Sequence, residues 1–263
     1  MAFRSKAEIR EPDSSSASCR HAGASRTWPR LARLGFLLLV LSIGLVSAFP
    51  GDDLPPSTAS EVDLYRGEKV SGDHEAFQRV ARRLQAVRVL RAHFDQTKKI
   101  TALRRPLLSS GRFLFSADHG LYWHTIKPFD SLFLVTQSGI TQREDGETTL
   151  NIAASEQPIV HGFTEIFLAL FGGDTSALQR SFDLYFQGDQ EHWTLGLKPK
   201  DRVMKRLIDH ITLRGVDTVA RIDFHETSGD VTQISLSDVQ TEPPQLTEAE
   251  LDLFGLQEEM PRR

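Results

Sequence analysis

Apolar positions in this chain follow a helical spacing first and a strand spacing afterwards. Between residues 73 and 90 they recur at steps of three and four, at Phe77, Val80, Leu84, Val87 and Leu90. This spacing puts the apolar side chains on one face of a helix, and arginines fill most positions between them. Asp73 can cap the first turn. The pattern predicts one amphipathic helix over residues 73–90.

After this helix the apolar positions alternate, as they do in half-buried strands. Turn-forming pairs such as Ser138-Gly139 and Gly188-Asp189 separate the alternating segments. We expect strands at 92–97, 111–117, 121–125, 131–136, 140–143, 182–187, 192–199, 207–213, 219–225 and 231–239. Their close, regular spacing favours an antiparallel meander over βαβ units. A sheet of about ten strands tends to curl into a half-barrel or barrel.

Residues 162–171 interrupt this rhythm with a segment that is apolar almost all round. Its large apolar side chains are Phe163, Ile166, Phe167, Leu168, Leu170 and Phe171. Gly172 and Gly173 end the segment, as glycines commonly end helices. A helix this apolar must be covered nearly completely. The sequence thus predicts a mainly β fold, with one large curved sheet or partial barrel and helices against its concave face.

The leading segment resembles an export signal. Arg30 and Arg33 precede a short apolar run over residues 34–48, and Val46-Ser47-Ala48 has the small side chains typical of a cleavage site. We expect cleavage after Ala48 and export to the periplasm, with an uncleaved anchor as the alternative. The expected organisation is a signal peptide with a long N-terminal extension at 1–48, a linker at 49–72, one β-rich domain at 73–240 and a flexible tail at 241–263.

Charge argues against nucleic acid as a partner. Residues 1–48 hold seven of the 31 basic and three of the 35 acidic residues, which leaves a net charge of −8 on the remainder. Nucleic acids select positive surfaces. An acidic body also disfavours permanent binding to anionic lipid headgroups, so we expect any lipid contact to be made with acyl chains.

No residue pattern indicates catalysis. The only cysteine is Cys19, and the histidines show no metal-binding spacing. Ser109-Ser110-Gly111 is not a nucleophile elbow, and there is no phosphate-binding glycine loop. We therefore expect no enzyme activity, no catalytic residues, no metal and no cofactor.

Four short motifs resemble the outer-membrane lipoprotein carrier (LolA-like) family. In order they are Phe94-Asp95-Gln96-Thr97, Gly111-Arg112-Phe113, Leu121-Tyr122-Trp123-His124-Thr125-Ile126-Lys127-Pro128 and Thr136-Gln137-Ser138-Gly139. The similarity covers residues 73–145 and extends to about 240 through architecture alone. The resemblance implies a mainly β fold with helices, an open antiparallel half-barrel with a helical lid over an apolar cavity, which agrees with the curved sheet predicted from periodicity. It also implies a soluble periplasmic shuttle that takes acylated cargo from an inner-membrane donor to an outer-membrane acceptor.

One departure concerns the lid. Family members that carry lipoproteins usually have an Arg-Pro pair shortly before the motif tryptophan, and the arginine helps to hold the lid shut. The matching stretch here is Ala117-Asp118-His119-Gly120. We therefore expect a divergent member with a different lid control. Its cargo is either a lipoprotein or a lipid-linked product such as a pigment or glycolipid.

The expected function is a monomeric periplasmic carrier that holds an acyl chain in an apolar cavity. An acyl chain offers no hydrogen bonds, so phenylalanine and leucine suit it. The expected lining of cavity and lid is Phe94, Phe113, Phe115, Leu121, Trp123, Leu132, Leu134, Phe163, Ile166, Phe167, Leu170 and Phe171. The bland alternative for these positions is an ordinary hydrophobic core. The alternative function is a periplasmic sensor or docking domain of the same fold that binds envelope proteins.

Overall fold

The fold is built on one antiparallel sheet. The computed structural model describes residues 64–70, 74–155 and 158–255. Eleven strands are ordered β6-β5-β4-β3-β2-β1-β11-β10-β9-β8-β7, and every neighbouring pair is antiparallel. The first and last strands of this order do not pair, so the sheet stays open. These features confirm the mainly β, open half-barrel predicted from the sequence.

The strands are short and joined mainly by tight turns. They are β1 Val89–Lys99, β2 Leu107–Ser116, β3 Gly120–Lys127, β4 Ser131–Thr136, β5 Gly139–Glu144, β6 Glu147–Ala153, β7 Phe182–Gly188, β8 Trp193–Pro199, β9 Ile208–Gly215, β10 Val219–Glu226 and β11 Val231–Gln240. The helices are α3 Glu75–Gln85, α4 Pro158–Gly172, α5 Thr175–Ser181 and α6 Glu248–Leu253, with a single 3-10 turn, η1, at Met204–Arg206.

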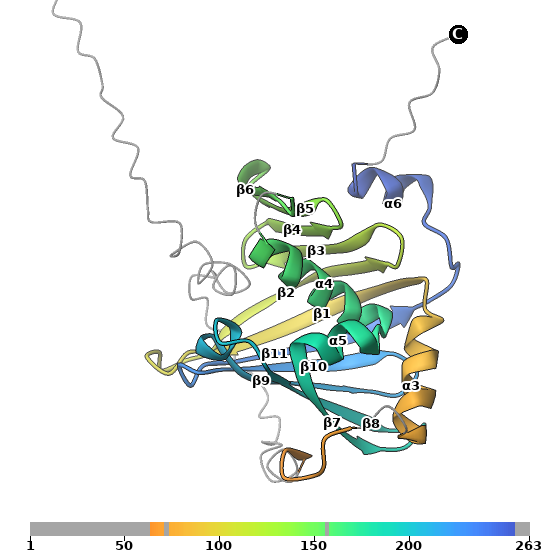
Figure 1. Cartoon of the computed structure of the whole chain (residues 1–263). Helices are drawn as coiled ribbons and strands as arrows, with labels where there is room; N and C mark the ends of the chain where they lie inside the picture. The colour runs from red at the N-terminus through yellow and green to blue at the C-terminus, as the bar shows by residue number, and fades with distance from the viewer. Residues whose placement is uncertain (1–63, 71–73, 156–157, 256–263) are drawn as a thin grey trace, which may run out of the picture.

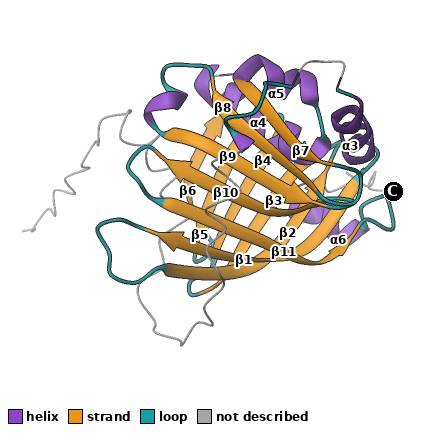
Figure 2. Cartoon of the chain, turned by 90° about the horizontal axis from the view of Figure 1, so that it is seen from below, coloured by secondary structure: helices purple, strands orange, loops and turns teal. Residues whose placement is uncertain are grey.

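Helices α3, α4 and α5 gather on the concave face of the curved sheet (Figures 1 and 2). Alternation along the strands creates this face. In β1 the concave side carries Leu90, Ala92 and Phe94, which are buried in the main apolar cluster with the helices. The convex side carries Arg91 and His93 in between. The period-two pattern of the sequence therefore determines which side chains meet the helices.

A second, smaller cluster lies on the convex face. It joins Val89, Leu114 and Tyr122 to Phe254, which follows α6. Arg91 fixes this region through two hydrogen bonds to the carboxylate of Glu250, at 2.6 and 2.8 Å. Residues 241–255 lie within the expected flexible tail, and this packing shows that they belong to the fold.

The segment before α3 also packs on the convex face. Leu64 is 4% exposed, and the Tyr65 hydroxyl donates a hydrogen bond to the Ile211 carbonyl at 2.9 Å. Lys69 pairs with Asp183 at 2.9 Å. Residues 64–70 lie within the expected linker 49–72, so the packed chain extends beyond the expected limits 73–240 on both sides.

Several predicted boundaries are wrong. The first helix ends at Gln85, not near residue 90, because Leu90 faces the core from β1. His74 caps this helix by accepting from the Phe77 amide at 3.2 Å, while Asp73 lies outside the described residues. Strand β6 was missed because its side chains are mostly polar and exposed. Helix α5 was missed because only seven residues form it.

The motif glycine Gly111 is explained by a close approach of two backbones. A Cβ atom at this position would lie 1.9 Å from the His124 carbonyl oxygen and 2.9 Å from the Phe94 ring. The β2–β3 register shifts between Ser110 and Gly111 at the same point. Only glycine allows β3 to pair this closely beside Phe94.

The leading segment lies outside the described residues. The expected signal peptide at 1–48 and its cleavage after Ala48 therefore stay predictions. Within the described ranges no helix has the length and apolar character that a membrane crossing requires.

Candidate functional site

Helix α4 lies across the concave face and is held there by aromatic contacts. The ring centre of Phe171 lies 4.6 Å from that of Phe113 and 5.9 Å from that of Phe115, both on β2. Phe171 is 3% exposed and the adjacent Leu170 is 2% exposed. The C-terminal half of α4 is thus part of the core in this structure.

An aromatic cluster continues from this contact across the sheet. Trp123 on β3 lies 5.6 Å from Phe113 and 4.2 Å from Phe94 between ring centres. These side chains belong to consecutive strands β1, β2 and β3, and the register pairs Phe113 directly with Trp123. Together they give the concave face a continuous aromatic surface.

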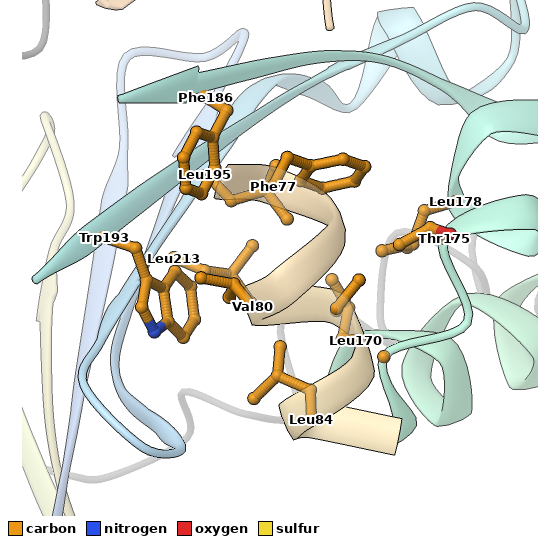
Figure 3. Close-up of a pocket in the computed structure, with 12 residues that line it drawn as sticks. Phe77, Val80, Leu84, Leu170, Thr175, Leu178, Phe186, Trp193, Leu195 and Leu213 are labelled. Carbon is orange, nitrogen blue, oxygen red and sulfur yellow. The ribbon is translucent and has the colours of Figure 1, made fainter. Parts of the chain in front are cut away.

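Two apolar pockets lie beside α4. The first lies under α3, where Phe77, Val80 and Leu84 line it together with Leu170 and Leu178 (Figure 3). Trp193, Leu195 and Leu213 line its other side. The second pocket is lined by Leu121, Trp123, Phe133, Leu170, Phe171, Ile222, Phe224 and Ile234. Leu170 lies in both linings and separates the two pockets.

The pockets are almost full. Each has about 10 Å³ of free space, which is the room that about one water needs. In both pockets, side chains of the covering helices occupy most of the space between these helices and the concave face. Neither of these two pockets has room for an acyl chain in this arrangement of α4.

Eight of the twelve expected lining residues meet in one cluster. All of them are buried in the main core: Phe94, Phe113, Phe115, Leu121 and Trp123 from the strands, and Ile166, Leu170 and Phe171 from α4. Phe163 and Phe167 lie in α4 by backbone, but their side chains are outside the described residues.

Leu132 and Leu134 do not belong to this cluster. They pack on the convex face with Tyr122 and Phe254. Their strand alternates with Phe133 and Val135 on the concave face, and Phe133 pairs with Trp123. The sequence of β4 is apolar at four successive positions, so alternation alone could not decide between the two faces.

The sequence interpretation also missed Ile222, Phe224 and Ile234 in the second pocket. These residues lie on β10 and β11, far along the chain from the motifs. Their alternation predicted strands correctly, but the pairing of β11 with β1 brings them opposite Trp123. A long-range pairing of this kind leaves no local sequence signal.

Two polar contacts of described residues join α4 and the turn after it to the neighbouring helices. The Gln85 side-chain amide donates to the Gly173 carbonyl at 2.9 Å, which ties the end of α3 to the end of α4. Arg180 on α5 pairs with Glu165 on α4 at 3.4 Å, and both side chains are substantially exposed. Exposed pairs contribute little to stability. Among the described residues, α4 is therefore held on the sheet mainly by apolar packing.

The lid also contains one poorly satisfied polar group. Thr164 on α4 is 3% exposed, and its hydroxyl has no hydrogen-bond partner among the described residues. Burying such a hydroxyl costs about 1–3 kcal/mol. The closed position of α4 is thus less stable than a fully apolar helix would make it.

A buried ion pair marks one end of the concave face. Lys98 on β1 is 2% exposed and lies 2.9 Å from Glu226 on β10. Within the ranges that the structure describes, no group of three or more histidine, cysteine or acidic residues is arranged to hold a metal. The site can therefore be described as an apolar face covered by a helix.

The fold and the site together define a protein with an open half-barrel sheet whose concave face is covered by helices. The chain belongs to the family described as outer membrane lipoprotein carrier protein LolA-like, whose model matches residues 71–253. This membership confirms the resemblance inferred from the motifs.

Solved structures show distant likeness. A LolA superfamily protein from Nitrosomonas europaea is 9% identical, with a TM-score of 0.37 over 66% of this chain and 96% of that one. A DUF1329 family protein from Desulfovibrio piger is 11% identical, with a TM-score of 0.38 over 70% and 98% of the two chains. MucB in the MucA/MucB complex from Pseudomonas aeruginosa is 13% identical, with a TM-score of 0.28 over 66% and 59%. No curated protein matches the chain.

Proposed function

We propose that this protein is a periplasmic carrier that exchanges its lid helix α4 for an acyl chain of its cargo. The observation that carries the proposal is the contact of Leu170 and Phe171 with the aromatic side chains of the concave face. This helix segment occupies the place that an acyl chain would take. Family membership supports a carrier role.

The energies of the two occupants are comparable. Full burial of a large apolar side chain contributes about 1.5–3 kcal/mol, and α4 buries Ile166, Leu170 and Phe171 nearly completely. An acyl chain gains about 0.8 kcal/mol per buried methylene. A chain of about ten methylenes would offset the lost lid contacts, so loading and release can both be reversible. A carrier needs this balance.

The proposed cargo-contacting residues are those the structure brings together. They are Phe94, Phe113, Phe115, Leu121 and Trp123 on the sheet and Ile166, Leu170 and Phe171 on the lid, with Phe133, Ile222, Phe224 and Ile234 added. Leu132 and Leu134 are left out because they face the other side of the sheet. The proposal includes export by the leading segment, a membrane donor, an outer-membrane acceptor and no catalytic step.

Lipid extraction and probe uptake test this proposal. Protein purified from the periplasm is extracted and analysed for lipid by mass spectrometry, and the emptied protein is titrated with a fluorescent fatty acid. We expect co-purified acylated material and saturable uptake. Leu170→Glu should abolish uptake while the β-type circular dichroism persists. Absence of both lipid and uptake would overturn the carrier assignment.

The closed hollow favours a second candidate. With about 10 Å³ free in each pocket, the fold also suits a sensor or docking domain whose apolar face stays closed while it binds an envelope protein. This alternative would be established if the protein binds no fatty acid and captures one protein partner in a stoichiometric complex.

A further inference from the structure

Exposed apolar side chains are concentrated at one end of the sheet. Because all strand pairs are antiparallel, the loops β1–β2, β3–β4, β8–β9 and β10–β11 meet at the same end. Of the seven large apolar side chains most exposed in the described chain, five lie on these loops or on the adjoining strand ends: Leu103, Leu108, Ile126, Phe129 and Val203, at 43–49% exposure. Val216 and Leu253 lie elsewhere.

Unpaired cations lie among these side chains. No acidic residue occurs between Asp95 and Asp118, although the body of the chain is acidic. Apart from Lys200, which lies 3.9 Å from Asp183, the exposed cations of two of these loops are Lys99, Arg104 and Arg105 on β1–β2 and Arg202, Lys205 and Arg206 on β8–β9. None of the six forms an ion pair with another residue that the structure describes.

The two basic loops are fixed to each other through the β10–β11 hairpin. The backbone amide and the hydroxyl of Thr101 donate to Asp230, at 2.9 and 3.0 Å. On the other side, the Thr227 hydroxyl donates to the Arg206 carbonyl at 2.7 Å. Figure 1 shows the β1–β2 and β10–β11 hairpins projecting side by side from the sheet. We name the six cations together with Leu103, Leu108 and Val203 the basic rim.

The acidic groups of the rim are few and already engaged. The Asp201 carboxylate accepts from the amides of Val203 and Met204, at 2.8 and 3.2 Å. Asp230 accepts from Thr101, and Glu226 is paired with the buried Lys98. The exposed carboxylate of Asp209 lies 2.7 Å from the His210 ring. The rim is therefore a local positive region on an acidic protein, with apolar side chains between its charges.

We propose that the basic rim docks this protein on the surface of an anionic lipid bilayer. Arginine and lysine attract anionic headgroups, while exposed leucine and valine side chains enter the boundary between headgroups and acyl chains. The acidic remainder of the chain is repelled by the same surface, which orients the rim toward it. The expectation from net charge alone, that headgroup binding is disfavoured, overlooked this local arrangement. The inference goes beyond the proposed function and does not require a bound cargo.

Vesicle flotation tests the proposal. The chain from Phe49 onward contains the whole described fold and lacks the leading apolar segment. It is floated with vesicles of phosphatidylcholine alone, or with a quarter of phosphatidylglycerol. We expect binding to the anionic vesicles only, weakened by 0.5 M salt because such charges are screened over a few ångströms.

Variants separate the rim from the rest of the surface. Arg104→Gln with Arg105→Gln should weaken vesicle binding by about tenfold or more, since each charge near the surface contributes appreciably. Leu103→Ser with Leu108→Ser should weaken it at unchanged charge. The matched controls are Arg82→Gln with Arg112→Gln, which removes two exposed cations outside the rim, and Val216→Ser at the opposite end. Both controls should bind normally.

Three results would overturn the proposal: no binding to anionic vesicles, equal loss in the control variants, or binding that survives loss of the apolar pair and is matched by a soluble polyanion. The last result would indicate an acidic macromolecule as the partner. Fatty-acid uptake without vesicles should be unchanged in the rim variants, so failure of rim docking is distinguishable from failure of the carrier assignment.

Discussion

The ring of Phe171 in α4 lies 4.6 Å from the ring of Phe113 in β2, with the two planes at 45°. This contact holds the C-terminal part of α4 against the aromatic face of the sheet. In the proposed exchange of α4 for an acyl chain, a cargo chain that reaches Phe113 must displace Phe171. Loading and lid opening are then a single event, and changes to the lid should affect uptake even where they touch no cargo.

Removing the Phe171 ring should weaken lid closure. We expect Phe171→Ala to lower the free energy of unfolding by about 3–5 kcal/mol, because a buried aromatic ring leaves a cavity. The fatty-acid probe should then enter faster. Urea denaturation and stopped-flow fluorescence measure the two effects. Phe129→Ala, which truncates a ring that is 49% exposed, is the control and should change neither. Unchanged uptake by a folded Phe171→Ala protein would show that α4 does not control access of the probe to the aromatic face.

Replacing the buried hydroxyl of Thr164 should have the opposite effect. Thr164→Val keeps the shape of the side chain and removes a group that has no hydrogen-bond partner in the described structure. We expect the closed form to gain about 1 kcal/mol and probe uptake to slow by several-fold. Thermal unfolding and uptake kinetics check this. Faster uptake in this variant would contradict the view that the hydroxyl destabilises closure.

The link between Gln85 and Gly173 should act as a tether for the lid. Gln85→Ala removes the donor to the carbonyl of Gly173, the residue that directly follows α4. A hydrogen bond of this kind contributes about 0.5–1.5 kcal/mol, so we expect uptake to accelerate by a few-fold with little loss of stability. Gln187→Ala, on an exposed position of β7, is the control. Hydrogen exchange of α4 amides should rise in Gln85→Ala alone.

Docking of α6 should depend on pH. The hydrogen bond from Arg91 lowers the pKa of Glu250 from 4.5 to about 2. A carboxyl with a depressed pKa in the folded state stabilises the fold fully above 4.5, and this stabilisation is lost as pH falls from 4.5 toward 2. Urea unfolding across this pH range should show a fall in the free energy of unfolding of the unchanged protein that is absent from Glu250→Gln. At pH 7, Glu250→Gln should cost about 1–2 kcal/mol. If the free energy of unfolding depends on pH in the same way in both proteins, the Arg91–Glu250 contact is not the cause of the loss.

The sequence predicted those features that depend on local patterns. Alternation located most strands, and the glycine pair after residue 171 marked the end of α4. Alternation could not decide which face of the sheet Leu132 and Leu134 lie on, because Phe133 and Val135 are equally apolar. Only the pairing of β4 with β3 determines the face. Local patterns also could not show that helix side chains leave so little free space in the two pockets on the concave face. That outcome depends on the summed volumes of side chains from α3, α4 and α5, and residue spacing carries no information about volume.

The most direct test of the exchange mechanism uses Trp123, which lies 6% exposed beneath the lid. In the chain from Phe49 onward, Trp193→Phe leaves Trp123 as the single tryptophan. The measurement is quenching of its fluorescence by a fatty acid with a nitroxide on its acyl chain. The account predicts strong, saturable quenching that an unlabelled fatty acid reverses, with less quenching in Thr164→Val. Trp123 fluorescence that stays unquenched at saturating fatty acid would contradict the claim that an acyl chain replaces α4.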